Sequence, residues 1–438
     1  MSLPRYGDYR KTGVAWLADI PSHWQIYQAR RLFEQRRDPS LPGDEQLSAT
    51  QKYGVIPQRL FMEQEDQKVV LALGGLDNFK RVQPDDFVIS LRSFQGGIER
   101  SRYSGCVSPA YTVLRPQSGL VPGYWEHLLK SSMYIAALQT TTDGIRDGKS
   151  ISYGQFGALP VPLPSRREQT AIVAFLDHET AKIDALIAEQ EKLIALLAEK
   201  RQATVSRAVT RGLNLDAPMK YSGVSFIGEV PAHWGVAALK RHWSVTDCKH
   251  ITAEFVDEGY PLASIREVQS RYVSLDAAKR TTQLYYEQLI EGGRKPLPGD
   301  LILSRNATVG EVAQVTDKHP LFAMGQDVCL LRKLSHKSST DFMQSVISSE
   351  VVVEQLKNIM VGSTFKRVNV EEIRALQVPI PPPIEQVQIA AFIAGENQRL
   401  DSLEKEAVRA IDLLKERRTA LIAAAVTGQI DVRGLATL

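Results

Sequence analysis

The sequence has almost no cysteine, and the little it has is scattered. Cys106, Cys248 and Cys329 are the three cysteines of 438 residues, and no two of them have the C-x-x-C spacing of a zinc or redox site. An odd number of isolated thiols argues against a disulfide framework and against zinc. We therefore expect free thiols, mostly buried, and no metal in this chain.

Membrane and targeting patterns are also missing. No apolar run is long enough to span a bilayer, and the segment after Met1 lacks the charged-then-apolar pattern of a signal peptide. We therefore expect a cytoplasmic protein. The net charge of +3 is too small to indicate nucleic-acid binding by itself, so any such site must come from local clusters of polar and basic residues.

Motifs for catalysis are absent as well. The chain has neither the Gly-x-x-x-x-Gly-Lys-Ser/Thr phosphate loop nor the Asn-Pro-Pro-aromatic motif of an amino-methyltransferase. Two Asp-x-Lys triplets of the kind found in nucleases occur at 66–68 and 147–149, but neither recurs in the other half of the chain and chance explains both. His23 and His233 do recur, each before a tryptophan, which favours a structural role. We predict no catalytic residue.

The most informative feature is an internal repeat with an offset of about 210–217 residues. The matching segments are Ile20–Trp24 with Val230–Trp234, Pro84–Ser90 with Pro298–Ser304, Val161–Pro164 with Val378–Pro381, Glu168–Phe175 with Glu385–Phe392, and Glu199–Thr210 with Glu416–Thr427. So many matches in the same order exclude chance. The chain is therefore two copies of one plan.

Each half begins with a part rich in glycine, proline and β-branched residues, at about 14–160 and 224–377. Short apolar runs predict buried strands, and longer patterns predict helices between them. The expected strands are Phe87–Leu91, Ala110–Leu114, Leu301–Ser304 and Val328–Leu331, and the expected helices Tyr124–Gln139 and Thr340–Ile359. We predict two mixed α/β (α+β) domains in tandem.

Each half ends in a long stretch that favours helix. Residues Arg166–Val209 and Ile384–Val426 contain no proline and one glycine, Gly395, and are rich in Ala, Leu, Ile, Glu, Lys and Arg. Apolar residues recur in steps of four and three, as in a coiled coil, so we expect the two helices to pair. The spacing allows parallel or antiparallel pairing; we expect antiparallel, because it gives a duplicated chain a pseudo-twofold axis. The predicted seam is Ile172, Leu176, Ile183, Leu186, Leu193 and Leu197, facing Ile389, Ile393, Leu400, Leu403, Ala407, Ala410, Leu414 and Leu421, with polar interruptions at Glu179, Glu396, Lys200 and Arg417.

These motifs resemble one family over essentially the whole chain. The Ile-Pro-Ser-His-Trp entry, the Val-Pro-Leu-Pro and Glu-Gln junction, the long helix and the Ala-Val-Thr-Gly exit at Ala425–Gly428 are similar to type I restriction–modification DNA specificity (S) subunits. The resemblance implies two target recognition domains that each read half of a split, asymmetric DNA sequence. It also implies two methylation (M) subunits and restriction (R) subunits as partners, which carry S-adenosylmethionine, ATP and Mg; this chain would hold no cofactor.

DNA contacts should come from polar loops with Arg, Lys, Asn, Gln, Ser and Thr. Two such loops occur in each half; the first directly follows a predicted strand, and the second is a polar stretch further along the chain. The candidates are Arg92, Ser93, Gln95, Thr141, Thr142, Arg146, Lys149 and Ser150 in the first half, and Arg305, Asn306, Thr308, Ser363, Thr364, Lys366, Arg367 and Asn369 in the second. Lys52-Tyr53, Arg266 and the cluster Arg30–Arg37 are weaker candidates, and solvated surface loops are the alternative.

The expected domains are a first recognition domain at 1–160, a long helix at 165–210, a second recognition domain at 211–380, a second long helix at 384–427 and a tail at 428–438. The alternative function is a coiled-coil scaffold whose globular domains bind protein rather than DNA. A catalytic DNA methyltransferase is a third possibility, against which the missing motifs argue.

Overall fold

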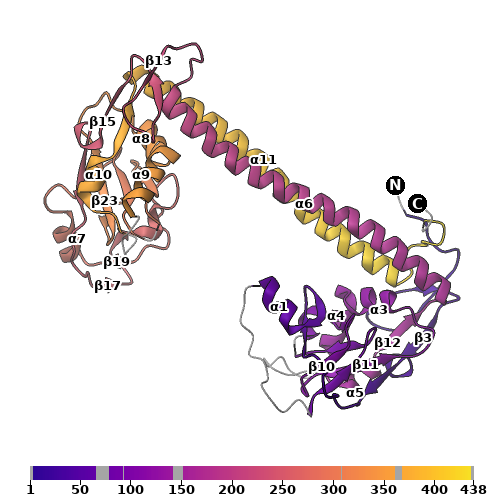
Figure 1. The fold of residues 1–438 in the computed structure, drawn as a ribbon. Coiled ribbons are helices and arrows are strands. Elements are labelled where there is room, and N and C mark those ends of the chain that lie inside the picture. Colours follow the sequence, from indigo (N-terminus) through magenta and orange to yellow (C-terminus); the bar gives the residue numbers. More distant parts are fainter. Residues whose placement is uncertain are drawn as a thin grey trace. The chain divides into compact units, whose positions relative to one another are not determined.

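The computed structural model describes residues 3–65, 78–91, 93–141, 151–306, 308–360 and 367–435. The chain forms two compact units, each with its own sheets and helices (Figure 1). Unit 1 comprises Met1–Glu191 and Val408–Leu438, and unit 2 comprises Lys192–Ala407. Both combine short strands with helices, so the predicted mixed α/β class is confirmed.

Unit 1 is built on a four-stranded antiparallel sheet. Its strand order is β4 (Phe33–Arg36), β11 (Thr112–Pro116), β8 (Phe87–Ile89) and β9 (Glu99–Arg100). Phe33 packs edge-on against Phe87, Trp125 and Phe156, an arrangement that buried aromatic rings favour. The remaining strands and helices are β1 (Tyr9–Arg10), β2 (Ile20–Pro21), β3 (Gln25–Gln28), β5 (Leu47–Thr50), β6 (Gly54–Pro57), α1 (Gln58–Glu65), β7 (Lys80–Val82), α2 (Ser93–Gly96), β10 (Gly105–Val107), α5 (Tyr153–Ala158) and β12 (Pro160–Leu163).

Unit 2 repeats this sheet with the same order and the same antiparallel pairings. The order is β16 (Trp243–Asp247), β23 (Val328–Lys333), β20 (Leu301–Ser304) and β21 (Val312–Gln314). A second sheet joins β17 (Phe255–Val256), β19 (Arg280–Thr281), β18 (Tyr260–Ala263) and β22 (Ala323–Met324), with β18 and β22 parallel. The remaining strands and helices are β13 (Met219–Tyr221), β14 (Glu229–Pro231), β15 (Gly235–Ala238), α7 (Gln283–Ile290), α10 (Val370–Ala375) and β24 (Gln377–Ile380).

Two helices predicted as single elements are each broken in two. Residues 124–139 belong to α3 (Pro122–Leu129) and α4 (Ser132–Thr140), and residues 340–359 to α8 (Thr340–Ile347) and α9 (Glu350–Met360). The first break occurs because the Ser131 side chain accepts a hydrogen bond from the Tyr134 amide and starts a new helix. At the second, the Ser349 hydroxyl donates to the Val346 carbonyl and closes α8.

The two long helices are α6 (Arg166–Arg211) and α11 (Pro383–Val426). In unit 1, Ile172 near the start of α6 shares a core with Ala425 near the end of α11. In unit 2, Val209 near the end of α6 shares a core with Ile389 near the start of α11. The helices therefore run antiparallel.

The buried stripe of each helix differs in part from the predicted seam. Leu186, Leu193 and Leu403 were assigned to the seam, but they are 46%, 39% and 40% exposed. Counting steps of four and three from Ile183 leads instead to partly buried Ile187 and Ile194, one residue further along. Leucine and isoleucine are equally apolar and equal in size, so only the helix phase distinguishes these neighbouring positions.

Of the four predicted polar interruptions, Glu179 and Glu396 are partly buried, whereas the other two are displaced by one residue. The predicted positions Lys200 and Arg417 are exposed. Their neighbours lie in the stripe and form ion pairs between the helices, Arg201 with Asp401 at 2.6 Å in unit 2, and Arg418 with Asp184 at 2.9 Å in unit 1. The helix pair thus contains polar contacts that fix its register.

A buried carboxylate joins the start of α6 to the segment before β3. Glu168, 5% exposed at its side chain, accepts a hydrogen bond from Trp24 Nε1 at 3.0 Å and lies 2.7 Å from His23 Nε2. The Ser165 hydroxyl donates to its second oxygen at 2.7 Å. His23 therefore has a structural partner, in agreement with the expected structural role of this motif.

The same joint occurs in unit 2. Glu385 at the start of α11 accepts from Trp234 Nε1 at 2.9 Å and lies 2.7 Å from His233 Nε2. The repeated His-Trp and Glu-Gln motifs are thus the two sides of one joint, far apart in sequence and in contact in the fold.

We predict that Glu168→Gln lowers the stability of unit 1 most strongly near neutral pH. Burial alone would raise the pKa of Glu168, but hydrogen bonds from Ser165, His23 and Trp24 outweigh it and lower the pKa below the ordinary 4.5. The carboxylate therefore stabilises the fold above pH 4.5, and this stabilisation is lost as the pH falls through the folded-state pKa. Thermal unfolding at pH 7 should show a loss of about 1–3 kcal/mol. The difference from the wild type should shrink at acid pH; an equal loss at every pH would contradict this account.

The two ends of the described chain meet in unit 1. The Asp431 amide donates to the Pro4 carbonyl at 2.8 Å, and the Tyr9 hydroxyl donates to the Gly428 carbonyl at 3.0 Å. The C-terminal turn after α11 and the N-terminal segment thus occupy the place that one continuous connection, 212–218, occupies in unit 2.

Among the described helices, none is both long and apolar enough to cross a membrane.

Candidate nucleic-acid interface

In unit 2 the two predicted DNA-contact segments lie side by side. The segment 305–308 follows β20 directly. The Val368 amide donates to the Arg305 carbonyl at 2.9 Å, and Asn306 and Arg367 form an isolated antiparallel bridge. The backbone therefore places segments 305–306 and 367–368 next to each other, although they are far apart in sequence.

Asp327, in the turn before β23, connects these segments. Its φ of 62° is left-handed, a conformation that Asp tolerates better than most residues. The Asp327 carbonyl accepts from the Arg305 amide at 2.9 Å, and its carboxylate oxygens lie 3.4 Å from Asn306 Nδ2 and 3.4 Å from Arg367 Nη2. Asp327 is not among the residues predicted from the sequence, although its place after Gly325-Gln326 is typical of a turn.

Arg305 is not presented on the surface as a DNA contact requires. Its side chain is 3% exposed, and Nη2 lies 2.6 Å from Asp247 Oδ1 at the end of β16. The expectation of a surface guanidinium ignored this acidic neighbour, which is 58 residues earlier in the sequence. We therefore regard Arg305 as a positioning residue that holds the loop after β20 against β16.

The other described candidates of unit 2 differ in exposure. The Arg367 side chain is 40% exposed. Asn369 is exposed and caps α10 in a reciprocal arrangement with Glu372. Thr308 is half-buried, with its hydroxyl 3.3 Å from the Ser304 hydroxyl. Arg367 and Asn369 thus present the most accessible side chains of this group.

In unit 1 the corresponding segments are also neighbours. α2, which contains Ser93 and Gln95, packs against α4, and Thr141 caps the end of α4. Ser93 is buried, and its hydroxyl accepts from the Ser90 amide at 2.8 Å, so its role is to form the turn. Gln95 is exposed, and Thr141 is half-buried with its hydroxyl donating to Leu138.

The remaining candidates lie outside the described residues. They are Arg92, Thr142, Arg146, Lys149 and Ser150 in unit 1, and Ser363, Thr364 and Lys366 in unit 2. Their proposed role rests on the sequence.

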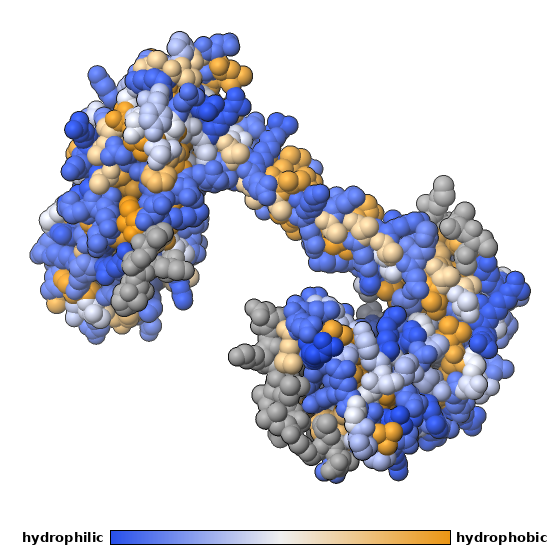
Figure 2. Space-filling view, in the orientation of Figure 1, coloured by the Kyte–Doolittle hydropathy of each residue, from blue (hydrophilic) through white to orange (hydrophobic). Residues whose placement is uncertain are grey.

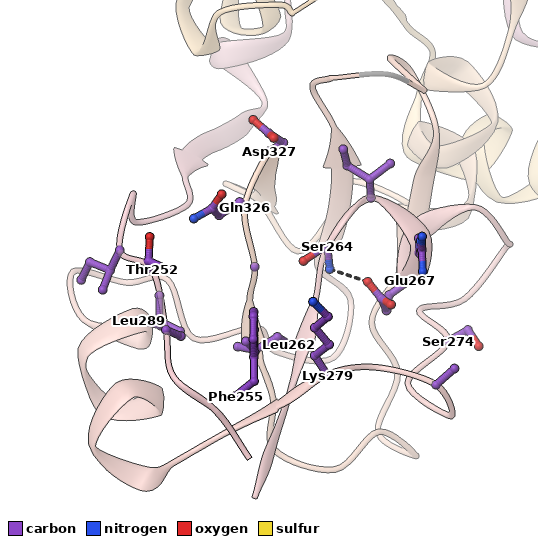
Figure 3. Close-up of a pocket in the computed structure, with 16 residues that line it drawn as sticks. Thr252, Phe255, Leu262, Ser264, Glu267, Ser274, Lys279, Leu289, Gln326 and Asp327 are labelled. Carbon is purple, nitrogen blue, oxygen red and sulfur yellow. Dashed lines mark hydrogen bonds between the residues drawn. The ribbon is translucent and has the colours of Figure 1, made fainter. Parts of the chain in front are cut away.

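A cavity of about 760 Å³ lies beside Asp327 in unit 2. Figure 3 shows Gln326 and Asp327 on one stretch of chain above Phe255, with Lys279 alongside. The Lys279 ammonium lies 4.3 Å from the Phe255 ring centre. Arg266, a weaker candidate from the sequence, also lines this cavity. The cavity lining combines the cationic groups of Arg266 and Lys279 with the carboxylates of Glu267 and Asp327 and with apolar side chains.

The other weaker candidates have partners of their own. Arg36 is buried and ion-paired with Asp86 at 2.7 Å, so the cluster Arg30–Arg37 is not one continuous basic surface. Lys52 lies over the Tyr53 ring at 4.8 Å. No group of three or more His, Cys, Asp or Glu side chains suited to a metal ion occurs in the parts of the chain that the structure describes.

Comparisons with known proteins identify a family that is similar in sequence. Residues 256–407 match the family model "Type I restriction modification DNA specificity domain". The EcoKI specificity subunit of Escherichia coli K12 is 22% identical over 81% of this chain and 76% of its own length. The putative MjaX specificity subunit of Methanocaldococcus jannaschii is 21% identical over 97% of both chains.

Solved structures share the fold. A chain from a study of assembly and conformational transition of the type I R-M system has a TM-score of 0.64 at 16% identity, covering 93% of this chain and 98% of its own. The HsdS subunit of Thermoanaerobacter tengcongensis has a TM-score of 0.53 at 16% identity, covering 94% and 98%. This chain therefore shares its fold with these solved chains. In sequence it is similar to type I restriction specificity subunits over most of its length, and residues 256–407 match the specificity-domain family model.

Proposed function

We propose that this chain binds a bipartite, asymmetric DNA sequence, with one half read by each unit. One observation carries the proposal: in both units, a predicted contact segment directly follows the same strand of the same four-stranded sheet, β8 in unit 1 and β20 in unit 2. Equivalent positions on equivalent frameworks suit two half-sites that are read in the same way but differ in sequence.

The chemistry of the loops suits this task. Arginine can donate two hydrogen bonds to guanine, and Asn or Gln can bind adenine by two. Hydroxyl, lysine and backbone amide groups hold phosphates. We propose Arg367, Asn369 and Gln95 as direct contacts, together with the sequence candidates at 363–366, next to Arg367, and at 142–150, in the second loop of unit 1.

We further propose that the chain is a scaffold for two methylation subunits and for restriction subunits in the cytoplasm. Its relatives from Escherichia coli and Methanocaldococcus jannaschii are named as specificity subunits of type I restriction enzymes. S-adenosylmethionine, ATP and Mg would then be held by those partners.

The test is DNA binding by the chain purified with its methylation partner. We expect a gel shift that is selective for one split sequence, with an affinity that falls steeply as salt rises because phosphate contacts release counterions. If the globular parts bind protein instead, the complex will assemble without selective DNA binding, and the scaffold alternative will stand.

We predict that the purified chain alone binds neither S-adenosylmethionine nor ATP, since the sequence lacks the motifs for both. Titration calorimetry should show no saturable heat for either compound with the lone chain, and clear S-adenosylmethionine binding once the methylation partner is added. Stoichiometric binding to the lone chain would overturn the assignment of both cofactors to partners.

A further inference from the structure

The two His-Trp-Glu joints are chemically alike but differ in what covers them. In unit 1 the Glu168 side chain is 5% exposed, whereas in unit 2 the Glu385 side chain is 33% exposed. Both carboxylates bind their histidine and tryptophan at nearly the same distances. The difference therefore lies outside the joint itself.

In unit 1 the side chain of Tyr6 shields the joint from solvent. Its ring is 5% exposed and packs 5.6 Å from the His23 ring and 5.9 Å from the Trp24 ring, measured between centroids. The Arg433 guanidinium lies 4.8 Å above the same ring. Burial and the nearby Glu168 charge raise the pKa of Tyr6, so the phenol stays neutral against the carboxylate.

In unit 2 the corresponding place is a cavity. It has a volume of about 360 Å³ and is lined by Leu213, Asn214, His233, Glu385, Gln388 and Ile389. His233 and Glu385 are the counterparts of His23 and Glu168, which face Tyr6 in unit 1. The connection that begins with Leu213 and Asn214 runs past the joint without placing an aromatic ring on it.

The helix face beside this cavity is apolar only in unit 2. Ile384 and Val387 on α11 are 74% and 61% exposed. Their counterparts on α6 are Arg167 and Thr170, which are exposed polar residues. Leu215, 75% exposed, lies in the adjoining connection, and apolar residues are visible at the surface near β13 (Figure 2). Exposed apolar residues around a cavity mark a protein-binding surface.

We propose that this cavity receives an aromatic side chain, accompanied by a basic one, from a partner protein. The occupant is inferred from unit 1, where a tyrosine and an arginine fill the equivalent place. The partly exposed Glu385 carboxylate supplies charge complementarity to the basic residue. Resting on the proposed function, we assign the aromatic segment to a methylation subunit. The two joints are then inequivalent, because one is closed by the chain itself and the other by its partner.

The first test uses two variants. The double variant Ile384→Arg and Val387→Thr replaces the apolar face with the corresponding residues of unit 1. The single variant Gln388→Trp fills the cavity. Each should raise the dissociation constant for the methylation subunit by about tenfold or more, as for the central residues of an interface. The control is Thr170→Val in unit 1, which should leave the dissociation constant unchanged because Tyr6 already covers that joint. Unchanged binding by all variants, with normal thermal unfolding, would overturn the proposal.

The second test places a photocrosslinking benzoylphenylalanine at Leu213 in the full chain, within the assembled complex. We expect a crosslink to the methylation subunit, mapped by mass spectrometry to a segment with an aromatic and a basic residue. A crosslink to a second copy of this chain, or none, would contradict the proposal. If the complex assembles through this cavity but does not bind DNA selectively, the proposed function fails and the docking site stands.

Discussion

Replacing the loop segment 363–369 should change one half of the methylated sequence and leave the other half intact. Each base pair that a recognition domain no longer reads costs about 1–3 kcal/mol of discrimination, so losing a whole loop should abolish selection for that half-site. The structure supports independence, because segment 367–369 pairs with 305–306 of its own unit. Genome-wide mapping of methylated sites in a host carrying the variant measures the result.

The matched control is replacement of segment 140–150 in unit 1, which should alter the opposite half of the target. The double replacement should alter both. If either single replacement changes both halves together, the units do not read separately and the modular account is wrong.

Lengthening both long helices by four residues should lengthen the unread gap in the DNA target by about two base pairs. Four helical residues add about 6 Å, and four residues are close to one helical turn, so the apolar stripe stays roughly in phase. Suitable positions follow Leu193 on α6 and Ala410 on α11, since Arg201 pairs with Asp401 and Asp184 with Arg418 on either side. Methylation mapping should show the same half-sites with a longer gap.

The control for this experiment inserts four residues in α6 alone. That change shifts one helix against the other by a full turn and separates ion pairs such as Asp184 with Arg418, so complex formation should be weakened. An unchanged gap with full activity in the double insertion would mean that the helices do not set the spacing.

The sequence predicted most of the framework because repetition supplied an internal comparison. The buried strand Leu301–Ser304 has the predicted bounds, and the expected mixed fold is present. Apolar periodicity did not predict helix breaks or the buried face of a helix where a single residue decides them. Ser131 starts a new helix where apolar periodicity alone continues, and at Ile187 the helix phase, rather than leucine content, determines burial.

The sequence predicts which loops are candidates for DNA contact better than it predicts which side chains of those loops are exposed. Arg305 is a residue type that often contacts DNA. In the fold, however, its side chain is buried 2.6 Å from Asp247, which lies 58 residues away in the sequence. Asp327, which joins Asn306 to Arg367, is acidic and therefore does not fit a search for basic residues. Only the fold shows that a carboxylate organises this basic junction.

The segments that contain Pro4 and Asp431 meet in unit 1, so a covalent link between them would replace a contact that the fold already makes. The Asp431 amide donates a hydrogen bond to the Pro4 carbonyl. In unit 2 the equivalent place is occupied by the continuous connection 212–218. The order of the two units along the gene is therefore arbitrary for the fold. A circular permutant that links the segments around Pro4 and Asp431, with new ends opened between 216 and 217, should keep the core contacts of both units.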